Sequence, residues 1–204
     1  MNELIEFTSG ATDTLYSDVI KDGLKKRILI FNENVTDDLV EDYMYHIIKW
    51  NLEDKDLPKD ARKKIRIMFN SCGGDVMIAF GMIDVIKSSE TPIIAIGVGL
   101  VASAAFYIYI GCHTRISFAN TVFLQHDGEL TMGNTHTKVK ETMAFIDEMD
   151  ARITRYVLDN TTMTQEFYDD HYAMDYYMYA QEAKENGAVD MIIGEDIQMA
   201  QVFN

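Results

Sequence analysis

Cysteine, proline and basic charge are all scarce in this chain of 204 residues. Its two cysteines, Cys72 and Cys112, are too few for a disulfide scaffold or a four-ligand zinc site. Lys and Arg number 18 against 33 Asp and Glu, which gives a formal net charge of −15. Because nucleic-acid binding depends largely on Lys and Arg at phosphates, we expect no DNA or RNA partner. The cysteine usage indicates a reducing compartment, and we expect a cytoplasmic protein.

Long uninterrupted apolar runs are missing as well. The longest apolar stretch, residues 92–110, contains two glycines, a serine and two tyrosines, so we expect no membrane span. The opening MNELIEFTSG has neither a basic nor an apolar segment and does not predict a signal peptide. The remaining composition, 48% hydrophobic and 25% charged, is typical of a globular domain with a sizeable core.

Short apolar runs alternate with helical patterns along most of the chain. The pattern predicts strands near residues 27–31, 65–70, 92–99, 115–118, 121–125 and 189–193. It predicts helices near 36–52 and 75–89, from 103, over 135–158, from 164, and from 181 to 187. This alternation indicates right-handed βαβ units on a largely parallel sheet in one domain. Residues 1–14 are polar and without periodicity, and we expect a flexible N-terminal arm there.

Polar residues gather where several of these strands end. The second expected strand runs into the Gly73-Gly74 turn, the third ends four residues before Ser103, and the fifth ends at His126. In open α/β sheets, ligands bind beyond the carboxyl ends of the strands. If these strands are neighbours, the glycine turn, Ser103 and His126 meet at one rim of the sheet.

Ser103 has two interpretations on pattern alone. It lies between Ala102 and Ala104 where a strand passes into a helix, so a substrate could approach closely and the helix N-terminus could stabilise an oxyanion. It could equally be an ordinary N-cap serine. The Gly73-Gly74 turn either supplies a second oxyanion donor or is a turn that requires positive φ. No phosphate-binding loop is expected, because GxGxxG and GKS or GKT are absent.

His126 is the one histidine of five that ends an apolar strand at this rim, although His113 lies in a connection that could also be near it. The other three, His46, His136 and His171, fall in helical stretches. Metal-ligand spacing such as HExxH or paired CxxC is absent, so we expect neither metal nor cofactor. The pattern does not single out a carboxylate partner for His126 among 33 acidic residues.

Four segments, in this order, resemble the proteolytic subunits of the Clp protease (ClpP) family. NSCGGDV at 70–76 is similar to the family's N-S-P-G-G-x-V turn, and GLVASAA at 99–105 to its nucleophile turn. NTVFLQH at 120–126 is similar to the N-S-x-x-M-I-H strand, and residues 175–190 to the D-x-F-x-S-A-x-E-A segment. The resemblance covers roughly residues 14–195.

The resemblance implies a role for each matching residue. Ser103 would be the nucleophile, His126 the general base and then acid, and Asp175 the carboxylate that holds the imidazolium. The backbone N–H groups of Gly74 and Ala104 would form the oxyanion hole.

The resemblance also implies an architecture and an assembly. The fold would be a ClpP/crotonase-like α/β spiral of βαβ units, with a protruding handle over about 127–160. The peptidase domain would span 15–195, between the arm at 1–14 and a tail at 196–204. Heptameric rings would stack as a tetradecamer around a chamber, where unfolded polypeptide fed by an AAA+ unfoldase is hydrolysed without ATP.

Several positions depart from the family pattern, including one in the glycine turn and one beside Asp175. Cys72 stands where the family has proline, and Met174 where it commonly has an arginine of an inter-ring ion pair. Three other functions stay open: a catalytically silent ClpP-like ring subunit, a phage maturation protease, and a crotonase-like acyl-CoA enzyme.

Overall fold

The computed structural model describes the backbone of residues 3–203 and the side chains of residues 15–203. The strands are β1 (Ile28–Phe31), β2 (Ile65–Ser71), β3 (Ile93–Ala102), β4 (Thr114–Phe118), β5 (Val122–Gln125), β6 (Tyr176–Tyr179) and β7 (Met191–Ile193). The α-helices are α1 (Glu3–Lys26), α2 (Tyr45–Glu53), α3 (Val76–Ser88), α4 (Ala104–Ile110), α5 (His136–Asn160), α6 (Gln165–Tyr172), α7 (Ala180–Glu185) and α8 (Met199–Phe203). A π-helical turn, η1 (Val40–Met44), precedes α2, and a short 3-10 helix, η2 (Lys59–Ala61), precedes β2.

The strands form one sheet in the order β1-β2-β3-β4-β7, and every neighbouring pair along this path is parallel. The remaining two strands leave this path: β5 pairs with β3 in parallel, and β6 pairs with β5 antiparallel. The largely parallel sheet expected from the alternating pattern is confirmed.

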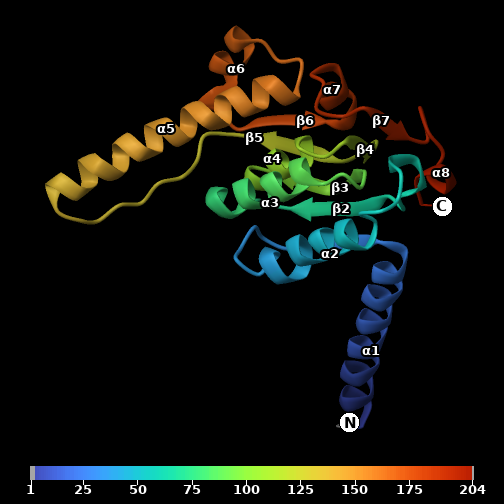
Figure 1. Ribbon diagram of the computed structural model, residues 1–204. Helices are drawn as coiled ribbons and strands as arrows, with labels where there is room; N and C mark the ends of the chain where they lie inside the picture. The colour runs from blue at the N-terminus through green and yellow to red at the C-terminus, as the bar shows by residue number, and fades with distance from the viewer. Residues whose placement is uncertain (1–2, 204) are drawn as a thin grey trace.

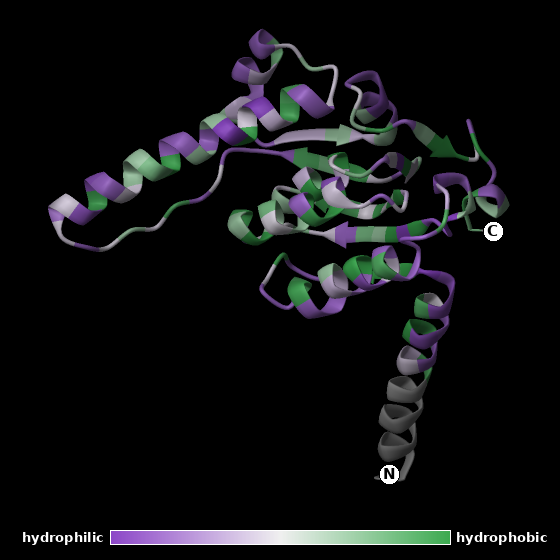
Figure 2. Ribbon diagram, in the orientation of Figure 1, coloured by the Kyte–Doolittle hydropathy of each residue, from purple (hydrophilic) through white to green (hydrophobic). Residues whose placement is uncertain are grey.

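Helix α4 lies at the centre of the core. All seven of its residues are buried, and it packs against α3 and the sheet. Its sequence, AAFYIYI, is apolar around the whole helix, which is the pattern of a helix with no solvent-facing side. Figure 2 shows how the core differs from the surface helices: apolar residues are concentrated on the central strands and inner helices, whereas α5 carries apolar and polar residues along its length.

Helix α5 projects from the body of the molecule, and the segment before it runs alongside the helix back to the sheet (Figure 1). The long helix expected near 135–158 is therefore present. In Figure 1 the arrowheads of β2 and β5 point toward the side from which α5 projects, so the carboxyl rim of the sheet lies at the base of this helix.

Both ends of the chain carry helices that the pattern did not predict. Residues 3–14 belong to α1, and Met1 and Asn2 lie outside the described residues. At the other end, Val202 of α8 is buried against Ile94, Ile96 and Ile116. The division of the chain into arm, domain and tail at residues 14 and 195 stays a prediction.

Three further details differ from the expectation. The third strand does not stop at Gly99 but continues to Ala102, directly before Ser103. Strand β6 was not expected, and the helix expected from residue 36 begins only at Val40. Within the part of the chain that the structure describes, no helix is both long and apolar enough to cross a bilayer.

Candidate active site

Ser103 has an unusual backbone conformation for an L-residue, with φ +54° and ψ −127°. It joins the end of β3 directly to α4, so the chain reverses sharply at this one residue. An ordinary N-cap residue lies in the β region and accepts a hydrogen bond through its side chain. Within residues 3–203, the Ser103 hydroxyl makes no such capping bond. A strained serine at a strand-to-helix turn is typical of an exposed nucleophile.

The glycine turn packs directly against this serine. A Cβ atom on Gly73 would lie 2.7 Å from Ser103 Cβ, 2.7 Å from the Ala102 carbonyl oxygen and 2.9 Å from the Ala104 nitrogen. Gly73 also has φ +93°, a value that favours glycine. The close approach and the backbone conformation each require glycine here, and together they bring the turn against the first turn of α4.

The backbone of Gly74 is held by a bridge to Val35. Gly74 forms a parallel bridge with Val35, in which the Val35 N–H donates to Gly73 O and the Asp75 N–H donates to Val35 O, both at 2.9 Å. This pairing uses the two neighbours of Gly74, so the Gly74 N–H itself is directed away from Val35. Asp75 then begins α3, because its carboxylate accepts the N–H groups of Met77 and Ile78.

His126 is brought to Ser103 by the pairing of β3 with β5. Ala102 is in register with Leu124, and the Ser103 N–H donates to Leu124 O at 2.9 Å. His126 lies two residues beyond Leu124, at the end of β5. The Gly73-Gly74 turn, Ser103 and His126 thus lie together at one rim, as the strand ends predicted.

Asp175 reaches His126 through the antiparallel pair of β5 and β6. Gln125 pairs with Tyr176, so the next residues outward, His126 and Asp175, face each other. Their Nδ1 and Oδ1 atoms are 3.6 Å apart, which is an ion-pair distance and slightly longer than a hydrogen bond. The His126 side chain is 22% exposed and that of Asp175 is 62% exposed. Catalytic hydrogen bonds are often this long before substrate binds.

The residue before His126 lies in the core. Gln125 is 2% exposed, and its Oε1 has no hydrogen-bond partner among the residues that the structure describes. On the rim side, the buried Tyr107 of α4 donates a long hydrogen bond of 3.4 Å to the His126 carbonyl oxygen. The sequence pattern identified neither Gln125 nor Tyr107 as a neighbour of His126, because these contacts are defined only in the folded chain.

The other histidines lie elsewhere. His113 accepts the Ile93 N–H at 3.0 Å, which puts it at the amino end of β3, so the alternative that left His113 open as a site residue does not hold. His171 stacks on Phe167, with ring centroids 4.2 Å apart. The ring of His46 lies beside that of Trp50, with centroids 5.6 Å apart. No group of three or more His, Cys, Asp or Glu side chains with metal-binding geometry occurs in the described portion of the chain.

The family follows from comparison with known sequences. A sequence model described as Clp protease matches residues 11–196. This chain belongs to the Clp protease family. The ATP-dependent Clp protease proteolytic subunit 2 of Bifidobacterium longum is 25% identical over 195 residues, which cover 91% of this chain and 86% of the relative. The proteolytic subunit 3 of Rhizobium johnstonii is 31% identical over 131 residues, or 63% of this chain and 68% of the relative.

A solved structure of the same family has the same fold. A ClpP1 mutant from Listeria monocytogenes superposes with a TM-score of 0.73, covering 86% of this chain and 95% of the other, at 24% identity. The expected ClpP-like α/β fold with a protruding long helix is confirmed. The low identities describe a divergent member of the family.

Proposed function

We propose that this chain is a serine endopeptidase of the ClpP type, with Ser103, His126 and Asp175 as its catalytic triad. The observation that carries the proposal is the strained backbone of Ser103, held between the Gly73-Gly74 turn and β5. Such strain persists only where the surrounding structure imposes it, and a serine that merely caps a helix needs none.

In the first half of the reaction, His126 accepts the Ser103 hydroxyl proton while Oγ bonds to the carbonyl carbon of the substrate peptide. The carbonyl electron pair moves to its oxygen, which the N–H groups of Gly74 and Ala104 stabilise. The carbonyl then re-forms, the C–N bond breaks, and His126 gives its proton to the leaving amine. The product is an ester on Ser103.

In the second half, His126 accepts a proton from a water molecule whose oxygen attacks the ester carbon. Collapse of this intermediate breaks the bond to Ser103, and His126 returns the proton to Oγ. Asp175 orients His126 through Nδ1, so the 3.6 Å separation shortens to a hydrogen bond when substrate is bound. No step requires a nucleotide, metal or cofactor.

The substrate is unfolded polypeptide, and the working form is a ring assembly in the cytoplasm. Heptameric rings stacked in pairs enclose the sites, and a separate AAA+ unfoldase spends ATP to feed the chamber. The projecting helix α5 supports this assembly, because a single chain leaves its Phe145 side chain 55% exposed. The two cysteines, both free, fit a reducing compartment.

The test is labelling with a fluorophosphonate, which reacts with activated serines, together with cleavage of a fluorogenic peptide and of unfolded casein. We expect label on Ser103, and Ser103→Ala to lower peptide cleavage by about 10⁴-fold or more. Ser88→Ala is the matched control, because Ser88 is an exposed serine at the end of α3.

Each alternative function predicts a different outcome. A silent ring subunit gives neither label nor cleavage, with or without an unfoldase. A maturation protease is labelled at Ser103 but leaves casein intact. A crotonase-like enzyme turns over acyl-CoA, and its Ser103→Ala variant retains that activity. Any of these results overturns the proposal.

A further inference from the structure

Strand β3 contains a bulge opposite Asn70. The β2–β3 ladder runs in register up to Phe69 and Gly97 and resumes at Ser71 and Val101. One residue of β2, Asn70, therefore faces three residues of β3. Gly99 in the middle of the bulge has φ +72°, which lets the strand bend there.

This bulge is the point at which β3 exchanges one partner for another. Before it, β3 pairs with β4 as far as Gly97 and Ser117. From the last residue of the bulge onward, β3 pairs with β5, beginning at Leu100 and Val122. Ser103 follows three residues later, so the position of Leu100 determines where Ser103 meets β5 and the glycine turn.

The Asn70 side chain fixes the bulge from both sides. Its Oδ1 accepts the Leu100 N–H at 3.0 Å, and its Nδ2 donates to Asn32 Oδ1 at 2.6 Å, just beyond β1. A Cβ on Gly99 would lie 2.6 Å from Asn70 Oδ1, so glycine leaves the space that the carboxamide fills. The Asn70 side chain thus links β2 and β3 to the residue that follows β1.

The geometry points to Asn70 as a positioning residue for the peptidase reaction, an inference that rests on the proposed function. Asn70 acts on Ser103 through the backbone at Leu100. The following residue fixes the other half of the rim, because Ser71 Oγ accepts the Gly73 N–H at 3.1 Å. Without the carboxamide, the second half of β3 can shift relative to the turn, and displacements of about 1 Å reduce catalysis by about 10²-fold.

The test compares variants of the full-length chain by peptide hydrolysis and by the rate of fluorophosphonate labelling. We expect Asn70→Ala to lower kcat and the labelling rate by about 10- to 100-fold, with KM changed by less than about threefold. Asn70→Asp retains an acceptor for the Leu100 N–H, and the Asn32 amide can rotate to donate to it, so most of the rate returns. Asn32→Ala, which removes only one of the two bonds, gives an intermediate rate and serves if Asn70→Ala does not fold.

Asn51→Ala is the matched control. The Asn51 carboxamide likewise accepts the N–H groups of Glu90 and Thr91, at 2.9 and 3.1 Å, but at the amino end of β3. This variant should lower the melting temperature and leave the labelling rate unchanged. Equal labelling rates for Asn70→Ala and Asn51→Ala, or no recovery in Asn70→Asp, would overturn the inference.

Hydrogen exchange separates this inference from the proposed function. Lack of labelling in the unmodified chain would refute the peptidase. Exchange of the Leu100 and Ser103 amides would still report on Asn70: faster exchange in Asn70→Ala, restored in Asn70→Asp, supports its positioning role. Unchanged exchange in Asn70→Ala refutes that role, whatever the activity.

Discussion

Ser103 keeps a backbone conformation that costs an L-residue about 1–3 kcal/mol, and the fold maintains it at the end of β3. The turn, the parallel partner β5 and the start of α4 all constrain the same residue, so no single contact can relax it. If Ser103 serves the chemistry at the cost of stability, a residue that tolerates positive φ at this position should make the protein more stable while the activity is lost.

Replacing Ser103 by glycine tests this conflict. Ser103→Gly should be more stable than Ser103→Ala by about 1 kcal/mol, because relief of strain exceeds the added chain entropy of glycine. Urea unfolding of both variants measures the difference. At Ser88, which ends helix α3, the order should reverse, since glycine is less favourable than alanine in a helix. An alanine at position 103 as stable as glycine would mean that no strain is stored there.

The sequence could predict three parts of the rim and not the fourth. The glycine turn, Ser103 and His126 each follow an apolar run, and local patterns locate such runs. Asp175 came only from the resemblance, because its approach to His126 depends on the register of two strands far apart in the chain. The pattern could not identify Asn70 for the same reason, because the bulge that its side chain contacts exists only once β2 and β3 are paired.

Among the elements, the junction of α1, β1 and α2 depends on one buried ion pair. Arg27, between α1 and β1, has φ +57° and donates two hydrogen bonds to Asp54, at 2.5 and 2.9 Å. Thr91, just before β3, donates a third hydrogen bond to this carboxylate at 3.1 Å. The hydrogen bonds from Arg27 lower the pKa of Asp54 below its ordinary value of 3.8.

This lowered pKa predicts how the stability depends on pH. A carboxylate whose pKa is depressed by folding stabilises the protein above its unfolded pKa, and the contribution is lost as pH falls through the folded pKa. Asp54→Asn should therefore reduce the free energy of unfolding by about 3 kcal/mol at pH 7, since it removes the buried carboxylate beside Arg27 and leaves the guanidinium paired with the more exposed Glu53, at 3.4 Å. The difference should shrink as the pH falls below 3.8.

Urea unfolding at pH 7 and at pH 3 measures both values. Asp22→Asn is the control, because Asp22 forms an exposed ion pair with Lys26 on α1 and such pairs contribute little. A stability difference for Asp54→Asn that stays the same at both pH values would contradict the linkage.

Elements with a strong local pattern were predicted well, and the others show what overrides the pattern. Strand β6 has the sequence YYMY, with no polar alternation, and becomes a strand because β5 offers an edge to pair with. Strand β3 continues past Gly99 because the bulge absorbs the positive φ of that glycine. Helix α1 has no strong apolar face, so the periodicity did not predict it.

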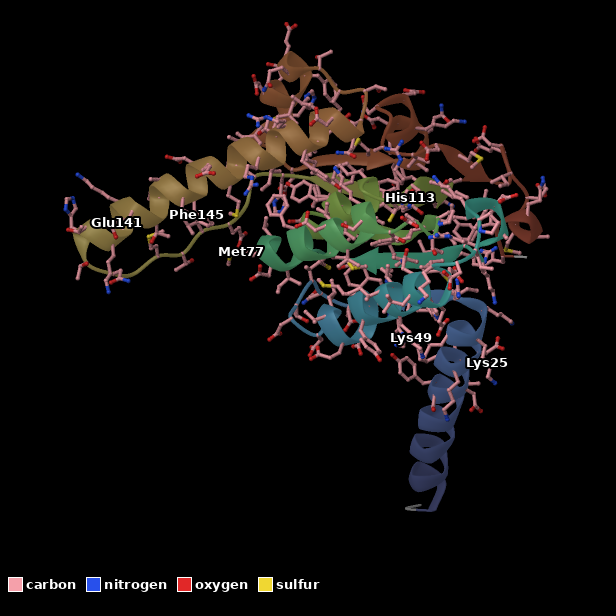
Figure 3. All side chains as sticks on the ribbon, in the orientation of Figure 1. Lys25, Lys49, Met77, His113, Glu141 and Phe145 are labelled. Atoms are coloured by element: carbon pink, nitrogen blue, oxygen red, sulfur yellow. The ribbon has the colours of Figure 1, made fainter. Side chains whose placement is uncertain are left out.

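At the scale of the whole molecule, α5 is the feature that a single chain does not explain. Phe145 lies on the projecting half of this helix, with Glu141 nearer the tip (Figure 3). Phe145 is 55% and Met143 39% exposed, and apolar side chains on a projecting helix indicate a contact with another protein surface. In the proposed assembly that surface is the α5 helix of the opposite ring.

The departure at Met174 bears on how the rings would hold together. Met174 is 53% exposed where the resemblance implies an arginine in an inter-ring ion pair. Contact between rings would then depend on apolar side chains such as Phe145. Apolar contacts do not weaken with salt, whereas exposed ion pairs are largely screened at 1 M, where the Debye length is about 3 Å.

Native mass measurement tests this assembly directly. The proposal predicts a species of fourteen times the 23.3 kDa chain, and light scattering should find it intact in 1 M salt. Phe145→Asp places a charge in the apolar contact and should yield a sevenfold species, whereas Glu141→Gln on the same helix should leave fourteen. Monomers or dimers of the unmodified chain would refute the ring assembly. A fourteenfold species that separates into sevenfold rings in 1 M salt would show instead that ion pairs hold the rings, because added salt weakens charge contacts and strengthens the burial of apolar surface.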